Sequence, residues 1–179
     1  MPVPYRKAPK SAASHCAAYL DVVWLRSTRT FYAGLLLIDS RGQPLEFVHN
    51  TLLAPGGFLW PEDQVRNLGV ATLCHSLFDT CQREPELLVC RNTLGPPAYC
   101  KSDIAPSIPF AQVIESHNGE PAAWNWINEP PSPGMSAHML GDTLRSRGLA
   151  VEPFTRIRLG LREVYPQAPW EEAQDDSGH

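Results

Sequence analysis

Two strand-length apolar runs near the start of the chain constrain the fold most. Residues 18–25 (AYLDVVWL) and 31–38 (FYAGLLLI) are rich in aromatic and β-branched side chains, which favours β-strands. The second run is nearly all apolar, so a strand formed by it is covered on both faces. We therefore expect an α/β domain in which helices flank a sheet.

A short turn joins the second run to a third predicted strand at residues 44–49 (PLEFVH). Asp39-Ser40-Arg41-Gly42 supplies a glycine, which adopts the left-handed conformation that a short hairpin loop requires. The second and third strands are therefore expected to be antiparallel neighbours.

A helix is expected to follow, beginning near Pro61. Proline fits the first helical turn, and Glu62 and Asp63 place negative charge at the positive end of the helix dipole. One apolar stripe then recurs at helical spacing, made of Val70, Leu73, Cys74, Leu77, Phe78 and Cys81. This amphipathic pattern predicts a helix that packs on the sheet.

The five cysteines form no short CxxC pair, so the sequence suggests neither a disulfide framework nor a zinc ribbon. Cys74, His75 and Cys81 could be imagined as metal ligands, but adjacent helical residues point about 100° apart. Cys74 and Cys81 also fall on the apolar stripe, and cysteine is among the most buried residue types. A structural role in the core is favoured.

The second half of the chain combines short strands with proline-rich connections. Residues 86–90 (ELLVC) predict a buried strand parallel to the first, and residues 110–115 (FAQVIE) predict another. Residues 119–133 are expected to form a long loop, and such loops are often functional. Trp124 and Trp126 within it either fill a gap in the core, which is the favoured interpretation, or form a contact surface.

Two helices are expected near the end of the chain. Residues 136–147 predict the first, with Ser136 as the N-cap, Met139, Leu140 and Leu144 facing inward and Gly148 as the C-terminal stop. Residues 153–165 (PFTRIRLGLREVY) favour a second helix over a strand in which arginines alternate with apolar residues.

A chain of 179 residues with 43% hydrophobic residues suffices for one domain with a buried core. Residues 1–16 are expected to form a flexible arm and residues 167–179 a solvated acidic tail, which leaves a single domain at 17–166. No apolar run reaches the length of about 18 residues that a membrane span needs. We expect a soluble, cytoplasmic protein with no membrane partner.

The chain carries a formal net charge of −4, so no global positive field attracts nucleic acid. Residues 143–165 are locally basic, and arginine suits bidentate contacts with phosphate. Salt bridges on solvated helix faces explain the same residues equally well. The candidate nucleic-acid-binding residues are Arg145, Arg147, Arg156, Arg158 and Arg162.

Asp21 is the first chemical clue. An ionised carboxylate inside an apolar strand is costly unless it lies at an exposed strand end, where it could pair with an arginine, or holds a metal. With Asp21 in its first strand and this order of elements, the chain resembles the ribonuclease H-like superfamily, whose first strand carries an Asp in a mixed sheet. The resemblance implies antiparallel hairpin strands plus parallel strands, flanked by helices. The nearest likeness, over residues 18–92, is to endonuclease V-like nucleases.

Two segments carry the likeness to endonuclease V-like nucleases. LDVVW at 20–24 looks like the first-strand motif of the family, and GFLWPED at 57–63 resembles the segment that leads into a helix with a metal-binding carboxylate. The resemblance implies that Asp21 and Asp63, or else Glu62, are catalytic. It also implies that Asp21 and Asp63 bind Mg²⁺ or Mn²⁺.

The pattern departs from the family at the second metal-binding Asp. PELLVCRN at 85–92 resembles the strand that ends in this residue, but the position holds Arg91, or Cys90 if the register slips by one. Neither is a hard oxygen ligand for Mg²⁺. A guanidinium could occupy the place of a metal and neutralise the carboxylates. A third carboxylate for an active site could instead come from Asp142 or Glu152.

The favoured hypothesis is an accessory or degenerate nuclease-like protein that binds DNA or RNA and has a helicase or another nucleic-acid enzyme as partner. The second is an active Mg²⁺-dependent endonuclease, which hydrolyses phosphodiesters with ions about 4 Å apart and so needs several converging carboxylates. The third is a protein-interaction module that uses the Trp/Pro-rich loop 119–133. The side chains around Asp21 separate the first two.

Overall fold

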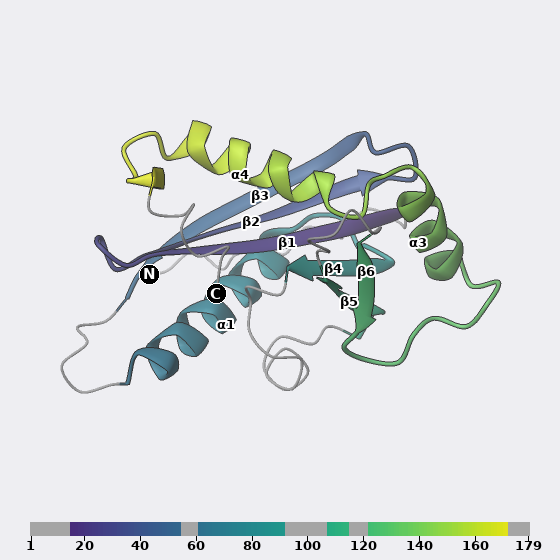
Figure 1. Cartoon of the computed structure of the whole chain (residues 1–179), viewed down its shortest axis with the longest axis horizontal. Helices are drawn as coiled ribbons and strands as arrows, with labels where there is room; N and C mark the ends of the chain where they lie inside the picture. The colour runs from purple at the N-terminus through teal and green to yellow at the C-terminus, as the bar shows by residue number, and fades with distance from the viewer. Residues whose placement is uncertain (1–14, 55–60, 92–106, 115–121, 172–179) are drawn as a thin grey trace, which may run out of the picture.

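In the computed structural model, the described residues are 15–54, 61–91, 107–114 and 122–171. They form a six-stranded sheet with helices on both faces (Figure 1). The strands are β1 Cys16–Leu25, β2 Thr30–Asp39, β3 Pro44–Leu53, β4 Leu87–Arg91, β5 Phe110–Ile114 and β6 Ala123–Trp126. The helices are α1 Glu62–Thr80, α3 Ser136–Ser146 and α4 Glu152–Val164.

β1 lies inside the sheet, whose order is β3-β2-β1-β4-β5-β6. It pairs antiparallel with β2 and parallel with β4, and β4 pairs parallel with β5. The predicted mixed α/β architecture of antiparallel hairpin strands plus parallel strands is confirmed. Gly42 has a φ of +82°, as the predicted hairpin loop between β2 and β3 requires.

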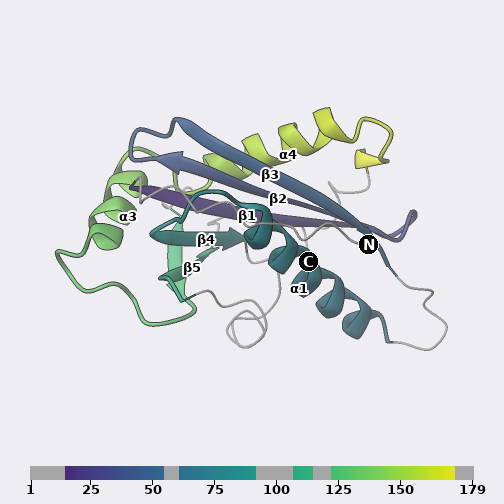
Figure 2. The same ribbon diagram turned by 180° about the vertical axis from the view of Figure 1, so that it is seen from behind.

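The sheet separates two hydrophobic cores, which we name after the helices that cover them. The α1-side core contains Leu73 of α1 together with Leu20 of β1. The α4-side core contains Leu144 of α3, Phe154 of α4 and Tyr19 of β1. Figures 1 and 2 show α1 and α4 on opposite sides of the sheet in both views. Successive side chains of a strand point to opposite faces. Even-numbered residues of β1 such as Leu20 therefore enter the α1-side core, and odd-numbered residues such as Tyr19 enter the α4-side core.

The stripe predicted for α1 is confirmed. Five of its six members are buried in the α1-side core, and Phe78 packs against that core at its margin. The cysteines among the described residues are buried there too, which agrees with the predicted structural role; they are Cys16, Cys74, Cys81 and Cys90. Cys100 lies outside the described residues.

The predicted loop 119–133 contains a strand that the sequence did not indicate. Residues 123–126 form β6, which pairs antiparallel with β5 at one edge of the sheet. Four residues with prolines on both sides are too few to display a convincing alternation. Residues 119–121 of the same segment lie outside the described residues.

The helix predicted at 136–147 is confirmed as α3, with two errors in its details. Met139 was expected to face inward, but it is 62% exposed, because the buried face of α3 includes Leu140 and Leu144 one and five positions further along. The N-cap is Met135 rather than Ser136, and no side chain caps this end.

The predicted helix at 153–165 is confirmed as α4. No described helix has the length and apolar character that a membrane crossing requires.

The packed core extends into both predicted flexible ends. Cys16 is the first residue of β1 and is buried. Ala168, at the other end, is buried in the α4-side core. Residues 1–14 and 172–179 lie outside the described part of the chain, so the limits of the arm and the tail stay a prediction.

A glycine on β2 sets how closely α4 approaches the sheet. A Cβ atom added to Gly34 would lie 2.6 Å from Cγ2 of Ile157 and 3.1 Å from the Phe47 ring. Gly34 is also the register partner of Asp21 on β1. The missing side chain therefore lets α4 lie close to the sheet beside Asp21.

We expect Gly34→Ala to lower the free energy of unfolding by about 1–3 kcal/mol, because overpacking displaces neighbouring side chains or backbone. Urea denaturation measures this loss. Ile157→Leu moves the branching methyl away from Gly34, so the double variant should recover part of the loss, with a coupling of at least about 0.5 kcal/mol. A Gly34→Ala protein as stable as the parent would contradict the close packing.

Candidate functional site

Asp21 is fully buried in the middle of β1. It shares its strand face with Tyr19 and therefore points into the α4-side core. Leu20 pairs with Cys90, so Arg91, the last residue of the shorter β4, comes next to Asp21. The interpretation of Asp21 as an exposed strand-end residue is wrong, and the acid instead lies at the level where β4 ends.

Two guanidinium groups surround one oxygen of Asp21. Nε of Arg158 donates a hydrogen bond to Oδ2 over 3.0 Å, and Nη1 of Arg91 lies 3.9 Å from the same oxygen. The Arg91 guanidinium also lies over the ring of Phe154, 5.6 Å from its centroid. The arginine side chains are 28% and 15% exposed, whereas Asp21 is 0% exposed. We call Asp21, Arg91 and Arg158 the Asp21 site.

Burial and charge act on Asp21 in opposite directions. Burial raises the pKa of Asp21 above its usual range, and the positive charges of Arg158 and Arg91 oppose that rise. Oδ1 is buried and has no hydrogen-bond partner among the described residues.

The Asp21 site does not fit a divalent metal. Mg²⁺ and Mn²⁺ favour several oxygen ligands, but Oδ2 of Asp21 already contacts two cationic groups. Across the described ranges, no three His, Cys, Asp or Glu side chains come together in a way that could hold a metal ion.

Glu62 and Asp63 do not join Asp21 in one site. Both lie in the first turn of α1, which packs on the opposite face of the sheet. Glu62 forms an ion pair of 3.3 Å with Arg26, and Arg26 lies five residues beyond Asp21, or about 16 Å along an extended strand. Asp63 is exposed. Catalytic or metal-binding roles for Asp21, Asp63 and Glu62 stay predictions.

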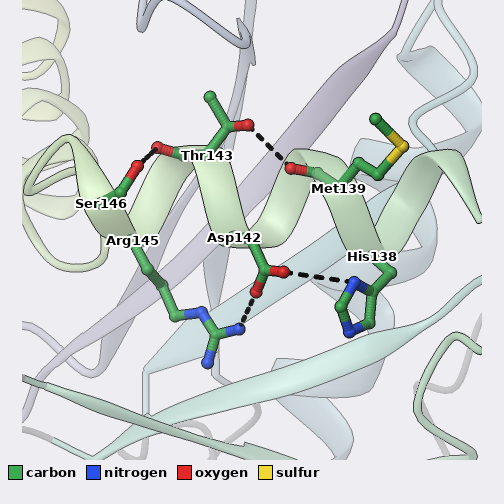
Figure 3. Close-up of polar contacts among 6 residues, drawn as sticks. All are labelled: His138, Met139, Asp142, Thr143, Arg145 and Ser146. Carbon is green, nitrogen blue, oxygen red and sulfur yellow. Dashed lines mark hydrogen bonds and ion pairs between the residues drawn. The ribbon is translucent and has the colours of Figure 1, made fainter. Parts of the chain in front are cut away.

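The two candidates for a third carboxylate are engaged by their own helices. Asp142 lies between His138, at 3.2 Å, and Arg145, which contacts its other oxygen (Figure 3). Glu152 accepts a hydrogen bond of 2.8 Å from Nε of Arg156. All three interactions link residues three or four positions apart on one helix, which is typical of solvated helix faces.

The candidate nucleic-acid-binding arginines fall into two groups. Arg145 pairs with Asp142 and lies over the Trp124 ring, and Arg156 also donates to the carbonyl oxygen of Gly42. Arg158 belongs to the Asp21 site. The remaining two are exposed, and their side chains form no hydrogen bond or ion pair with another described residue: Arg147 and Arg162.

The indoles of Trp124 and Trp126 are half-buried and pack against the α4-side core. Their rings meet edge to face with centroids 6.2 Å apart. Trp124 also approaches α3, where a Cβ added to Gly141 would lie 3.1 Å from its ring. These contacts agree with the interpretation of both residues as core-filling side chains.

The contact between Asp21 and Arg158 could not be read from the sequence, because 137 residues separate the two. The charge of Asp21 inside an apolar strand indicated that a partner exists. Arg91 was identified as a guanidinium that could take the place of a metal, and it lies beside Asp21. Nothing in the sequence distinguished Arg158 from the other arginines nearby.

No protein-family model matches the chain, and no curated protein matches it either. Nine solved chains are similar to it in structure. One is endonuclease V from Bacillus subtilis, with 12% identity and a TM-score of 0.43. The similarity covers 63% of this chain and 50% of that one, so the chain spans half the length of the protein it matches. A similarity of this extent transfers no residue role and no activity.

We expect Arg158→Met to lower the free energy of unfolding at neutral pH by about 3–5 kcal/mol, because it leaves a buried carboxylate short of its closest counter-charge. The loss should shrink as the pH falls. Burial raises the pKa of Asp21, and removal of Arg158 raises that pKa further. Because Asp21 titrates alike in both unfolded chains, the destabilisation is complete above the pKa of Asp21 in the folded variant and disappears below the pKa of Asp21 in the folded parent, where Asp21 is neutral in both folded proteins.

Urea denaturation between pH 4 and pH 7 measures this dependence. The matched control is Arg162→Met, which removes an exposed arginine from the same helix and should change stability by no more than about 0.5 kcal/mol. A loss for Arg158→Met that is constant over this pH range would show that Asp21 does not depend on Arg158 for its charge.

Proposed function

We propose that this protein is an accessory nuclease-like protein of nucleic-acid processing, which binds DNA or RNA without cutting it through metal ions of its own. One observation carries the proposal: the buried Asp21 contacts two guanidinium groups, Arg158 and Arg91, where a two-metal nuclease needs metal ions between carboxylates. A helicase or another nucleic-acid enzyme would then supply the chemistry.

The place of the Asp21 site in the sheet supports a binding role. β1 and β4 are neighbours in the sheet, but the chain leaves them in opposite directions. β1 is followed by β2, toward the β3 edge, whereas β4 is followed by β5, toward the β6 edge. The carboxyl end of β4 therefore lies at the point where the strand order reverses. In open α/β sheets, ligands bind outside the carboxyl ends of strands at such switch points.

The distribution of charge supports an anionic ligand. The whole chain has a formal charge of −4, so positive groups matter only where they gather. Arg91 and Arg158 gather at the Asp21 site, and the exposed Arg162 follows Arg158 by one turn on α4. Contacts from arginine to phosphate dominate the affinity of proteins for nucleic acids and depend on salt.

We expect the full chain to bind fluorescent DNA or RNA oligonucleotides at low salt, with an affinity that falls as salt rises. Arg147→Ala with Arg162→Ala should reduce the slope of log K against log salt by about one for each phosphate that the double variant no longer neutralises. Fluorescence anisotropy measures both effects. Arg26→Ala, which removes one exposed arginine whose partner Glu62 lies on α1, is the control for loss of a positive charge outside the basic segment and should leave the slope unchanged.

The same protein should neither bind Mg²⁺ or Mn²⁺ in calorimetric titration nor cleave the oligonucleotides in their presence. Metal-dependent cleavage that Asp21→Ala abolishes would overturn the accessory role in favour of an active endonuclease. Absence of binding to every oligonucleotide at low salt would reject a nucleic-acid function altogether.

A further inference from the structure

We propose that Asp21 is a positioning residue, which holds the guanidinium of Arg158 so that its terminal amino groups bind a phosphodiester of a polynucleotide backbone. The inference rests on the proposed function and assigns the group that contacts the ligand. It gives the buried acid a role that requires no metal.

The guanidinium of Arg158 is held at Nε, and its two terminal amino groups are left for a ligand. A guanidinium has five N–H donors in a rigid plane. The Nε–H of Arg158 donates to Oδ2 of Asp21 over 3.0 Å. The other four have no hydrogen-bond acceptor among the described residues, and the side chain is 28% exposed. Asp21 thus fixes the Nε side of the guanidinium and leaves the two terminal amino groups for an anion.

The backbone around the site limits the freedom of Arg158. Ile157, its neighbour on α4, lies against Gly34, where a Cβ would come within 2.6 Å of Cγ2. Gly34 is in turn paired with Asp21 across β1 and β2. The helix and the acid are therefore held by the same part of the sheet. An arginine fixed in this way loses less side-chain entropy when it binds a ligand.

Charge determines which anion the site fits. Arg91 lies 3.9 Å from the oxygen that Arg158 contacts, so the carboxylate is compensated from two sides and repels an incoming anion weakly. Arg162 is exposed and lies about 6 Å further along α4. Two guanidinium groups one helical turn apart form a row, which suits consecutive phosphates of one strand. Arginine contacts with phosphate are charge-assisted and often bidentate.

The test uses the full-length chain and anisotropy titrations with fluorescent single-stranded and double-stranded 20-mers at low salt. Arg158→Lys keeps the charge but removes the planar fork, and we expect affinity for the bound form to fall about tenfold. Asp21→Ala should weaken binding to a similar extent, although it removes a negative charge. Asp21→Asn should lie between this variant and the parent, because its amide oxygen can accept the same hydrogen bond from Nε.

The matched control is Glu163→Gln, which removes a negative charge from an exposed position on the same helix and should leave binding unchanged or slightly tighter. Asp21→Ala that binds as tightly as Glu163→Gln would overturn the positioning role, since the acid would then act only by repulsion. Equal affinity of Arg158→Lys and the parent would overturn the role of the fork. Thermal unfolding verifies that each variant is folded. If the Asp21 variants are not, equal affinity of Arg158→Lys and the parent still overturns the proposal, because the guanidinium that Asp21 is proposed to hold would then not bind the ligand.

Competition identifies the source of the phosphate. Millimolar inorganic phosphate should not displace the 20-mer, because it contacts only one guanidinium of the row. Complete displacement at that concentration would overturn the assignment to a polynucleotide. If the parent binds no oligonucleotide, the proposed function itself fails; if the parent binds and the Asp21 and Arg158 variants bind equally well, only this inference fails.

Discussion

A carboxylate buried in the centre of a β-sheet must be compensated from the face toward which it points, and here Arg158 and Arg91 provide that compensation. A buried charge without a partner costs several kcal/mol, so the ion pair constrains the elements that carry it. β4 must end beside Asp21, and α4 must cross β1 at the height of Arg158. Both requirements must be met within the apolar packing of the α4-side core.

Gly34 makes the second requirement possible. With any side chain at this position, Ile157 could not lie where it does, and α4 would be displaced from the sheet. The same closeness brings the guanidinium of Arg158 within hydrogen-bond distance of Asp21. An acid, a glycine and an arginine on three different elements therefore form one contiguous structural unit.

This unit also determines which chemistry the site can support. Hydrolysis by two metal ions needs acidic oxygens that converge on the ions, but α1 places Glu62 and Asp63 on the other side of the sheet. Guanidinium groups bind phosphate without activating water. The proposed function follows this chemistry: arginines at the end of β4 would hold a phosphate, and a separate enzyme would supply hydrolysis.

The sequence by itself determined most of the elements, because apolar periodicity is a local property: β1, β2, α1 and α4 are found within a few residues of their expected positions. It also indicated that Asp21 needs a partner and that Arg91 departs from the metal-binding pattern. Only the tertiary structure decided that Arg158 is the closest partner, that β6 completes the sheet and that Asp63 lies elsewhere. Each of these depends on how distant segments pack, and no short-range pattern records which side chains meet across 137 residues.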